Sequence, residues 1–163
     1  AGAQEKLGFL PNMYTYMARL PPVLDGYLRT YDDFRSQSGF SPAEQETVFL
    51  TISRVNGCHY CTAAHSMIAE KKSGVPADSL AALRDGRPLP DPDLQAVAVF
   101  TEAMVVSRGN PGKEAVDAFL AAGYGERQVL GIVLAIACKT FSNTINHLAA
   151  TPVDDVFAPF EAA

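Results

Sequence analysis

Two of the three cysteines, Cys58 and Cys61, form a C-x-x-C pair within NGCHYCTAAH, and His65 follows four residues after the second. On an α-helix, at 100° per residue, Cys61 lies about 60° short of a full turn from Cys58, and His65 lies about 20° short of two turns. The three side chains therefore share one stripe. His65 is about 6 Å of rise from Cys61 and about 10.5 Å from Cys58, so its imidazole can serve Cys61 directly.

Both cysteines fall in the first turn of the helix expected here. Unpaired N–H groups and the positive end of the helix dipole favour a thiolate at that position. A thiol with a lowered pKa, a nearby base and a second thiol three residues away make a reactive dithiol. One sulfur can attack an electrophile and the other can resolve the product as a disulfide, which suits peroxide reduction.

Other uses of a C-x-x-C pair are less favoured. A zinc site needs four ligands, or three plus water, and no second C-x-x-C or H-x-x-x-H follows, so no metal and no other cofactor is expected. Covalent haem needs a histidine directly after the second cysteine, where Thr62 stands. A thioredoxin-like site needs a strand before the helix. Two inert buried cysteines stay open, although Gly57, His59 and Tyr60 around them are not typical of a core.

Glu46 is a further candidate, on a helix that is apolar nearly all round. Its carboxylate lies either at the surface edge or inside the protein with a partner, because unpaired burial of a charge is costly. Periodicity alone favours a solvated glutamate.

The stretch NTINHLAA supplies three more polar side chains. Asn143 and His147 are four residues apart and share a helix face, with Asn146 beside them. They form either a solvated helix end or the floor of a pocket. Cys138 is expected to be a small core residue, and His59 to be exposed beside the dithiol.

The elements that must position these residues are helices, because helical periodicity runs through the chain and strand-like alternation does not persist. Ser41 begins an S-P-A-E motif that combines an N-cap, a proline in the first turn and a capping box, and this helix should run to about Val55. The dithiol helix is expected from about 58 to 72, ending before Gly74. Further helices are predicted over residues 12–20, 23–37, 78–84, 94–107, 113–122 and 125–149.

The predicted fold class is therefore all-α, with seven or eight helices and short connections. The length of 163 residues suits one domain, expected to span residues 1–163, with GRPLPDPD as a connector inside it. The sequence begins AGAQEKLGF rather than with Met, so an incomplete N-terminus is left open.

Charge and composition restrict the partners. The net charge is −5 and no cluster of four Lys or Arg exists, so no nucleic-acid partner is expected. The longest apolar run, VLGIVLAIAC, is too short to span a bilayer, so no membrane partner is expected either. An odd cysteine number and no visible signal peptide favour a reducing, cytoplasmic setting.

Glu46, Cys58, Cys61 and His65 together resemble the Glu…Cys-x-x-Cys-x-x-x-His signature of the alkylhydroperoxidase D-like proteins, in the carboxymuconolactone decarboxylase superfamily. The stretches GFLPNMY, FSPAEQETV, SRVNGCHYCTAAH and NTINHLAATPVDDVFAPF look like its peroxidase-related branch. The resemblance therefore covers nearly the whole chain.

This resemblance implies the alkylhydroperoxidase D-like helical fold and a thiol-dependent peroxidase that reduces alkyl or hydrogen peroxides. It implies that Glu46 and His65 form a proton relay through water, that Cys61 is the peroxidatic thiol, and that Cys58 resolves its sulfenic acid to a Cys58–Cys61 disulfide. A dithiol or protein reductant would then reduce this disulfide. The resemblance also implies a homo-oligomer, a trimer or hexamer.

The chain departs from the alkylhydroperoxidase pattern at one position. That pattern carries a histidine just before the second cysteine, where this chain has Tyr60 and a histidine one residue earlier, His59. Both residues are therefore candidates for the pocket.

Two alternatives remain open. One is a lactone decarboxylase on the same scaffold, but the decarboxylases of this superfamily work without the cysteine pair. The other is a non-enzymatic redox-sensing oligomer, whose dithiol would oxidise slowly and without turnover.

Overall fold

The computed structural model describes residues 8–161, and within this range the secondary structure is entirely helical. The all-α prediction is thus confirmed. The α-helices are α2 (Asn12–Met17), α3 (Pro21–Gln37), α4 (Pro42–Val55), α5 (His59–Ile68), α6 (Ala77–Asp85), α7 (Pro92–Val106), α8 (Lys113–Ala121) and α9 (Glu126–Ala149).

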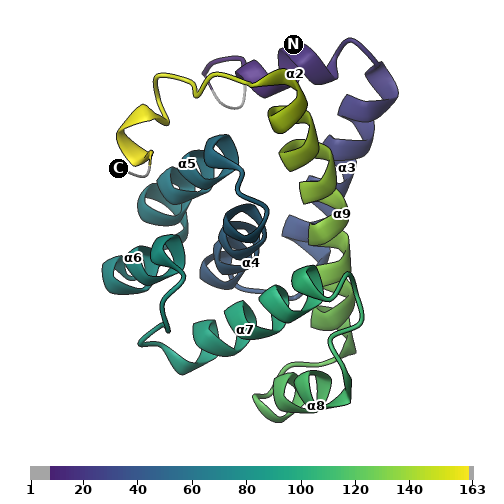
Figure 1. The fold of residues 1–163 in the computed structure, drawn as a ribbon, viewed down its shortest axis with the longest axis vertical. Coiled ribbons are helices and arrows are strands. Elements are labelled where there is room, and N and C mark those ends of the chain that lie inside the picture. The colour runs from purple at the N-terminus through teal and green to yellow at the C-terminus, as the bar shows by residue number, and fades with distance from the viewer. Residues whose placement is uncertain (1–7, 162–163) are drawn as a thin grey trace.

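Helix α4 lies at the centre of the molecule, with α5, α6, α7 and α9 around it (Figure 1). Every residue from 45 to 53 is buried. A helix that is buried all round must satisfy its polar side chains within the protein. This central position therefore decides the surroundings of Glu46.

The predicted start of α4 is confirmed. The Ser41 side chain accepts a hydrogen bond from the backbone N–H of Glu44, and the Glu44 carboxylate accepts one from the backbone N–H of Ser41 at 2.7 Å. The other Glu44 oxygen accepts a hydrogen bond from the Tyr124 hydroxyl at 2.6 Å. The capping box thus also ties α4 to the segment that precedes α9.

The dithiol helix differs from the expectation at both ends. Cys58 is the extended N-cap residue of α5, with φ −88° and ψ 95°, so it stands before the first helical turn and only Cys61 lies within it. At the other end α5 continues as a π-helical turn, Ala69–Ser73. Gly74 then ends it at a positive φ of 68°, a conformation that glycine adopts without strain.

The early helices also differ in their bounds. The first was expected to reach residue 20 but ends at Met17. The next was expected to start after the two prolines, but Pro21 and Pro22 lie inside its first turn. A proline costs little there, because the first N–H groups of a helix have no partner within it.

Helix α9 packs against α3 and α4 and buries Ile132, Ala135 and Cys138. Cys138 is a core residue, as expected. Within residues 8–161, α9 is the one helix long and apolar enough to cross a membrane, with 39% of the apolar window buried. This is weak evidence for a membrane, because the core helix of a soluble protein has the same length and composition.

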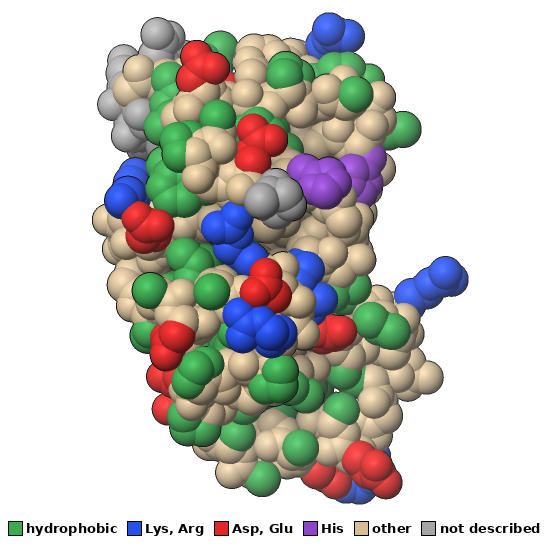
Figure 2. All heavy atoms as spheres, turned by 60° about the vertical axis from the view of Figure 1, so that its left-hand side comes forward, with side chains coloured by type: hydrophobic (Ala, Val, Ile, Leu, Met, Phe, Trp, Pro, Cys, Tyr) green, Lys and Arg blue, Asp and Glu red, His purple; other side chains and the backbone are tan. Residues whose placement is uncertain are grey.

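The segment after α9 returns across the molecule to α5, where the short 3₁₀ turn Ala158–Phe160 lies (Figure 1). Asp154 accepts hydrogen bonds from the backbone N–H of Asn12 at 3.1 Å and from the Tyr60 hydroxyl at 2.5 Å. The two ends of the described chain therefore meet over the helix that carries the dithiol. On the face in Figure 2, Lys and Arg side chains lie among Asp and Glu rather than in one basic patch.

Replacing Ser41 with alanine should lower the free energy of unfolding by about 1 kcal/mol, because a backbone N–H of α4 loses its side-chain acceptor. Urea unfolding followed by circular dichroism measures this change. Ser36→Ala is the matched control. The Ser36 hydroxyl is exposed and donates to a carbonyl within its own helix, so this change should stay within about 0.5 kcal/mol. Equal losses in the two variants would contradict the role of the cap.

Candidate active site

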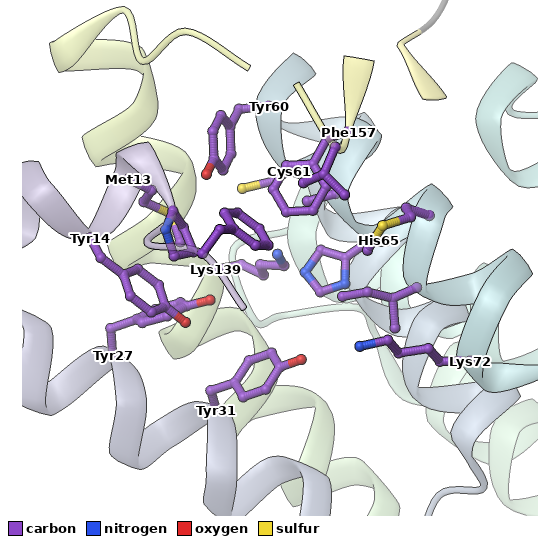
Figure 3. A pocket seen from close by; sticks show the side chains of 16 residues that line it. Met13, Tyr14, Tyr27, Tyr31, Tyr60, Cys61, His65, Lys72, Lys139 and Phe157 are labelled. Carbon is purple, nitrogen blue, oxygen red and sulfur yellow. The ribbon is translucent and has the colours of Figure 1, made fainter. Parts of the chain in front are cut away.

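A cavity of about 300 Å³ opens beside α5, and Cys61 lies on its wall (Figure 3). Cys58 does not line it, although the two cysteines are similarly buried, at 1% and 2% exposure. The cavity therefore presents one thiol of the pair. Its lining residues are Phe9, Pro11, Met13, Tyr14, Tyr27, Tyr31, Tyr60, Cys61, Ala64, His65, Met67, Ile68, Lys72, Lys139, Val156 and Phe157.

Asn146 brings an amide to the dithiol from α9. Its Nδ2 lies 3.3 Å from the Cys61 sulfur and 4.0 Å from the Cys58 sulfur, and also 3.2 Å from the Met13 sulfur. An N–H donor near a sulfur favours the thiolate over the thiol. Asn146 thus contacts the dithiol itself, although it does not line the cavity.

The other two residues of the NTINHLAA stretch have different positions. Asn143 is buried and accepts a hydrogen bond from the Asn56 side chain at 2.9 Å, which holds the turn before α5. His147 is exposed, with its Nε2 3.3 Å from the Gly57 carbonyl oxygen. This helix end is therefore divided, with Asn143 and Asn146 inside the protein and His147 at the solvated edge.

Glu46 and His65 form a direct pair, with 2.7 Å between Oε2 and Nδ1, so the expectation that water connects the two residues is wrong. Glu46 has no exposed surface, so the solvated glutamate that periodicity favours is wrong. The reason is the central position of α4, which leaves no solvent-facing side. Because an ionised carboxylate only accepts hydrogen bonds, the neutral imidazole must carry its proton on Nδ1. Its Nε2 is then free to act as a base.

The second carboxylate oxygen of Glu46 is paired with the guanidinium of Arg35 from α3. Arg35 also donates to the Tyr31 hydroxyl at 2.8 Å and to the Gln45 side-chain oxygen at 3.1 Å. Arg35 is not among the site residues predicted from the sequence. The only signal was its position four residues after Tyr31, which places both on one face of the helix.

Burial would raise the pKa of Glu46, but His65 and Arg35 lower it more, so that this pKa lies below its ordinary value. Burial lowers the pKa of His65, and so does the charge of Lys139, while Glu46 opposes them only in part. At neutral pH the carboxylate is thus ionised and the imidazole neutral. This is the state in which His65 accepts a proton.

The two thiols have opposite shifts. Burial would raise the pKa of Cys61, but the hydrogen bond from Cys58 and the charge of Lys139 bring it well below its ordinary value. The hydrogen bond with Cys61, together with burial, raises the pKa of Cys58 far above the ordinary thiol value. Cys61 is therefore the thiol of the pair that ionises first, and Cys58 keeps its proton. This is the distribution that a nucleophile and its resolving thiol require.

Lys139 is a further residue that the sequence analysis missed. It lines the cavity although its side chain is only 1% exposed, and its ammonium lies 4.8 Å from the centre of the Phe49 ring. The signal was a polar stripe on α9. Lys139, Asn143 and Asn146 follow one another four and three residues apart within an otherwise apolar helix.

Tyr60 and His59 occupy different surroundings. Tyr60 is buried and lines the cavity, so the expectation that it does not belong to a core is wrong. Its hydroxyl is held by Asp154, and its ring packs edge-to-face on Phe157. His59 is exposed, as expected, and lies in a separate depression beside Arg54. His59 therefore does not take the place of a histidine in the cavity.

The fold and site define a class of all-α proteins in which a buried Glu–His pair lies beside a C-x-x-C dithiol. The model of the carboxymuconolactone decarboxylase family matches residues 21–102, a range that includes Glu46, both cysteines and His65. This range is slightly more than half of the chain. The chain therefore belongs to the carboxymuconolactone decarboxylase family.

Solved structures have the same fold. A peroxidase-related protein from Ralstonia eutropha JMP134 with an alkylhydroperoxidase AhpD core is 21% identical, with a TM-score of 0.84 over 96% of this chain and 83% of that one. The debrominase Bmp8 in complex with 2,3,4-tribromopyrrole is 20% identical, with a TM-score of 0.82 over 98% and 85%. A peroxidase-related protein from Silicibacter sp. TM1040 is 24% identical, with a TM-score of 0.74 over 93% and 79%.

A comparison with curated proteins finds no match. The family match and the shared fold confirm the resemblance to alkylhydroperoxidase D-like proteins at the level of fold and family. Within residues 8–161 no group of three or more His, Cys, Asp and Glu side chains is placed to hold a metal ion.

The lowered pKa of His65 predicts acid-sensitive stability. Below the unfolded value of about 6.5, the unfolded chain binds a proton at this residue that the folded protein does not bind. The free energy of unfolding should therefore fall as the pH decreases from about 7.5 to about 5. The effect of Glu46 adds to this only below about pH 4.5, where its unfolded carboxyl takes up a proton.

Urea unfolding at several pH values tests this, with His65→Gln compared to the wild type. Glutamine keeps an amide near Glu46 but does not titrate, so the decrease between about pH 7.5 and about pH 5 should become shallower. His59→Gln is the control at an exposed position and should keep the wild-type slope. An unchanged slope in His65→Gln would show that His65 does not cause the acid sensitivity.

Proposed function

We propose that this protein is a thiol-dependent peroxidase that reduces alkyl or hydrogen peroxides through a Cys58–Cys61 dithiol–disulfide cycle. The observation that carries the proposal is the position of Cys61. It is the one thiol of the pair on the cavity wall, its pKa is held well below the ordinary value, and the neutral base His65 lies beside it. Two findings support the same chemistry. The chain belongs to the carboxymuconolactone decarboxylase family, and it shares its fold with peroxidase-related proteins.

The proposed reaction begins with the Cys61 thiolate, which attacks the terminal oxygen of a peroxide. A sulfur–oxygen bond forms, the oxygen–oxygen bond breaks, and Cys61 becomes a sulfenic acid while an alcohol or water is released. The Cys58 thiol then attacks the sulfenic sulfur, water leaves, and a disulfide forms. A small dithiol or a protein dithiol restores both cysteines by exchange. Glu46 holds the imidazole at Nδ1, so that His65 Nε2 is free to accept and return the protons of these steps.

The walls of the cavity favour organic peroxides. Four tyrosine rings, two phenylalanine rings and several aliphatic side chains surround the thiol. A volume of about 300 Å³ is in the range of small-molecule sites. Moving an apolar group from water to such walls is favourable, because its surface is removed from solvent. An alkyl or aryl hydroperoxide should therefore react faster than hydrogen peroxide at equal concentration.

The same walls favour a second candidate, the reductive removal of a halogen from an aromatic ring. The debrominase neighbour shares the fold with a brominated pyrrole bound, and the cavity here is aromatic and holds one thiol. In this reaction an aryl bromide and two thiols become the arene, a disulfide, bromide and a proton. Bromide release from 2,3,4-tribromopyrrole with a small dithiol, absent in Cys61→Ser, would establish this candidate.

The lactone decarboxylase and the redox sensor remain alternatives with clear signatures. A decarboxylase would turn over a lactone acid equally well after Cys58→Ser and Cys61→Ser. A sensor would react with peroxide no faster than a free thiol. The homo-oligomer also stays a prediction, and the exposed Leu130, Val133 and Leu148 on α9 support it.

Peroxide treatment of a Cys58→Ser variant should give one sulfenic acid, at Cys61, that dimedone traps and peptide mass spectrometry locates. Without Cys58 the sulfenic acid cannot close to the disulfide, and so it accumulates. Cys138→Ser is the control, because Cys138 is buried outside the cavity and its pKa is raised by burial. This variant should consume peroxide at the wild-type rate, whereas Cys61→Ser should not consume it. Intact Cys61 after peroxide treatment would exclude the peroxidase.

A further inference from the structure

We propose that Lys139 is a further catalytic residue. Its ammonium pairs with the Cys61 thiolate in the reduced protein and then donates the proton that the leaving alkoxide requires. The thiolate pairing is inferred from the burial and position of Lys139 and does not depend on the reaction, whereas the proton donation rests on the proposed peroxidase function. The two parts are tested by different measurements.

The position of Lys139 shows that it has a role beyond packing. The side chain extends from α9 into the cavity, and Figure 3 shows its nitrogen directed to the space beside His65 and Cys61. Within residues 8–161 the ammonium makes no hydrogen bond and no ion pair. The face of Phe49 at 4.8 Å offers only a cation–π contact. An ammonium on the wall of a largely apolar cavity is poorly solvated, and an anion beside it would stabilise it.

The charges around the cavity identify that anion. Arg35 and Glu46 neutralise each other, and burial together with the charge of Lys139 lowers the pKa of His65, so that its imidazole is neutral. The remaining positive charge that is buried is that of Lys139. It is balanced if Cys61 is a thiolate, which agrees with the lowered pKa of this thiol. The other titratable groups near the cavity are Tyr14 from α2, Tyr27 and Tyr31 from α3, Cys58 and Tyr60 with its partner Asp154, Lys72 at the exposed end of the π-helical turn, and Cys138 from α9.

The same charge balance should hold through the reaction. The Cys61 thiolate, the Lys139 ammonium and an organic hydroperoxide become the sulfenic acid, the neutral lysine amine and an alcohol. The electron pair of the oxygen–oxygen bond leaves on the alkoxide, and the ammonium supplies the proton that makes it an alcohol. No buried charge is created or left without a partner. When an external dithiol later reduces the disulfide, the proton of the Cys61 thiol passes through His65 to the amine and restores the ion pair.

Three variants separate the pairing with the thiolate from the donation of the proton. All three carry Cys58→Ser, so that Cys61 is the thiol of the pair that reacts. Lys139→Met removes both the charge and the proton. Lys139→Arg keeps the charge, but a guanidinium does not give up its proton at ordinary pH. Lys72→Met removes the other lysine of the cavity, which is exposed. Circular dichroism verifies that each variant is folded.

The first measurement is the pH dependence of the ultraviolet absorbance of the thiolate, which requires no peroxide. Lys139→Met should raise the midpoint by at least about one pH unit, because the thiolate loses its partner. Lys139→Arg should move it by less than about half a unit, and Lys72→Met likewise, because solvent screens an exposed charge. An unchanged midpoint in folded Lys139→Met would overturn the pairing.

The second measurement is the single-turnover rate with two peroxides, at a pH where the thiol is fully ionised. Cumene hydroperoxide releases an alkoxide that needs a proton, whereas a peroxybenzoic acid releases a carboxylate that does not. Lys139→Arg should slow the reaction with cumene hydroperoxide about 10²-fold and that with the peracid less than about 10-fold. Equal slowing with both peroxides, or none, would overturn the proton donation.

The Cys58→Ser parent with Lys139 intact gives a test that does not depend on the folding of the lysine variants. Its thiol should be ionised at neutral pH, and reaction with cumene hydroperoxide should take up no proton from a weakly buffered indicator solution, because Lys139 supplies it. Uptake of one proton per peroxide would overturn the donation, and a thiol un-ionised at neutral pH would overturn the pairing. A protein that passes the thiolate test but does not react with any peroxide refutes the peroxidase and leaves the ion pair standing.

Discussion

The Glu46 carboxylate has no contact with solvent, and side chains from the neighbouring helices replace water as its partners. Arg35 from α3 holds one oxygen and His65 from α5 holds the other, so that α4 is joined to both neighbours through one side chain. A buried ionised carboxylate is tolerated only with partners of this kind. The arrangement also fixes the imidazole tautomer, with the proton on Nδ1 and Nε2 left without one. Stability and chemistry therefore depend on the same three side chains.

Helix α9 supplies the complementary part of the site. Its apolar face fills the core, while Lys139 and Asn146 bring a cation and an amide to the sulfur of Cys61. The Glu46–His65 pair and this polar stripe approach the thiol from different helices. The charges and donors that favour a thiolate at Cys61 are thus part of the packed protein, so they are already in place around this sulfur.

Local sequence signals predicted the elements well. The capping box at Ser41 and the glycine at position 74 each depend on a few adjacent residues, and the structure contains both. The relation of Cys61 to His65 was also predictable, since the two lie within one helix. Cys58 was placed wrongly inside the helix because an N-cap and a first helical residue differ in backbone angles that residue type does not determine.

The longer-range part of the site could not be derived in this way. Glu46 is buried because other helices surround α4, and its own periodicity does not contain that information. Arg35 comes from the helix before α4 and Lys139 from the last long helix, and the local polar pattern around each residue does not say which side chain it meets. The resemblance to the family signature did group Glu46 with His65, and these two side chains are in contact. A signature of this kind can include residues that are distant in the chain but adjacent in the fold. The signature here did not include the two cations.

The hydrogen bonds that join Asp154 to Tyr60 and to the backbone of Asn12 have a consequence for how sequences of this kind can vary. Terminal segments of a domain ordinarily tolerate substitution, truncation and fusion freely. Here both segments cover the reactive sulfur, and Phe157 forms part of its cavity wall. Substitutions in either segment should therefore change the shape of the cavity on whose wall Cys61 lies.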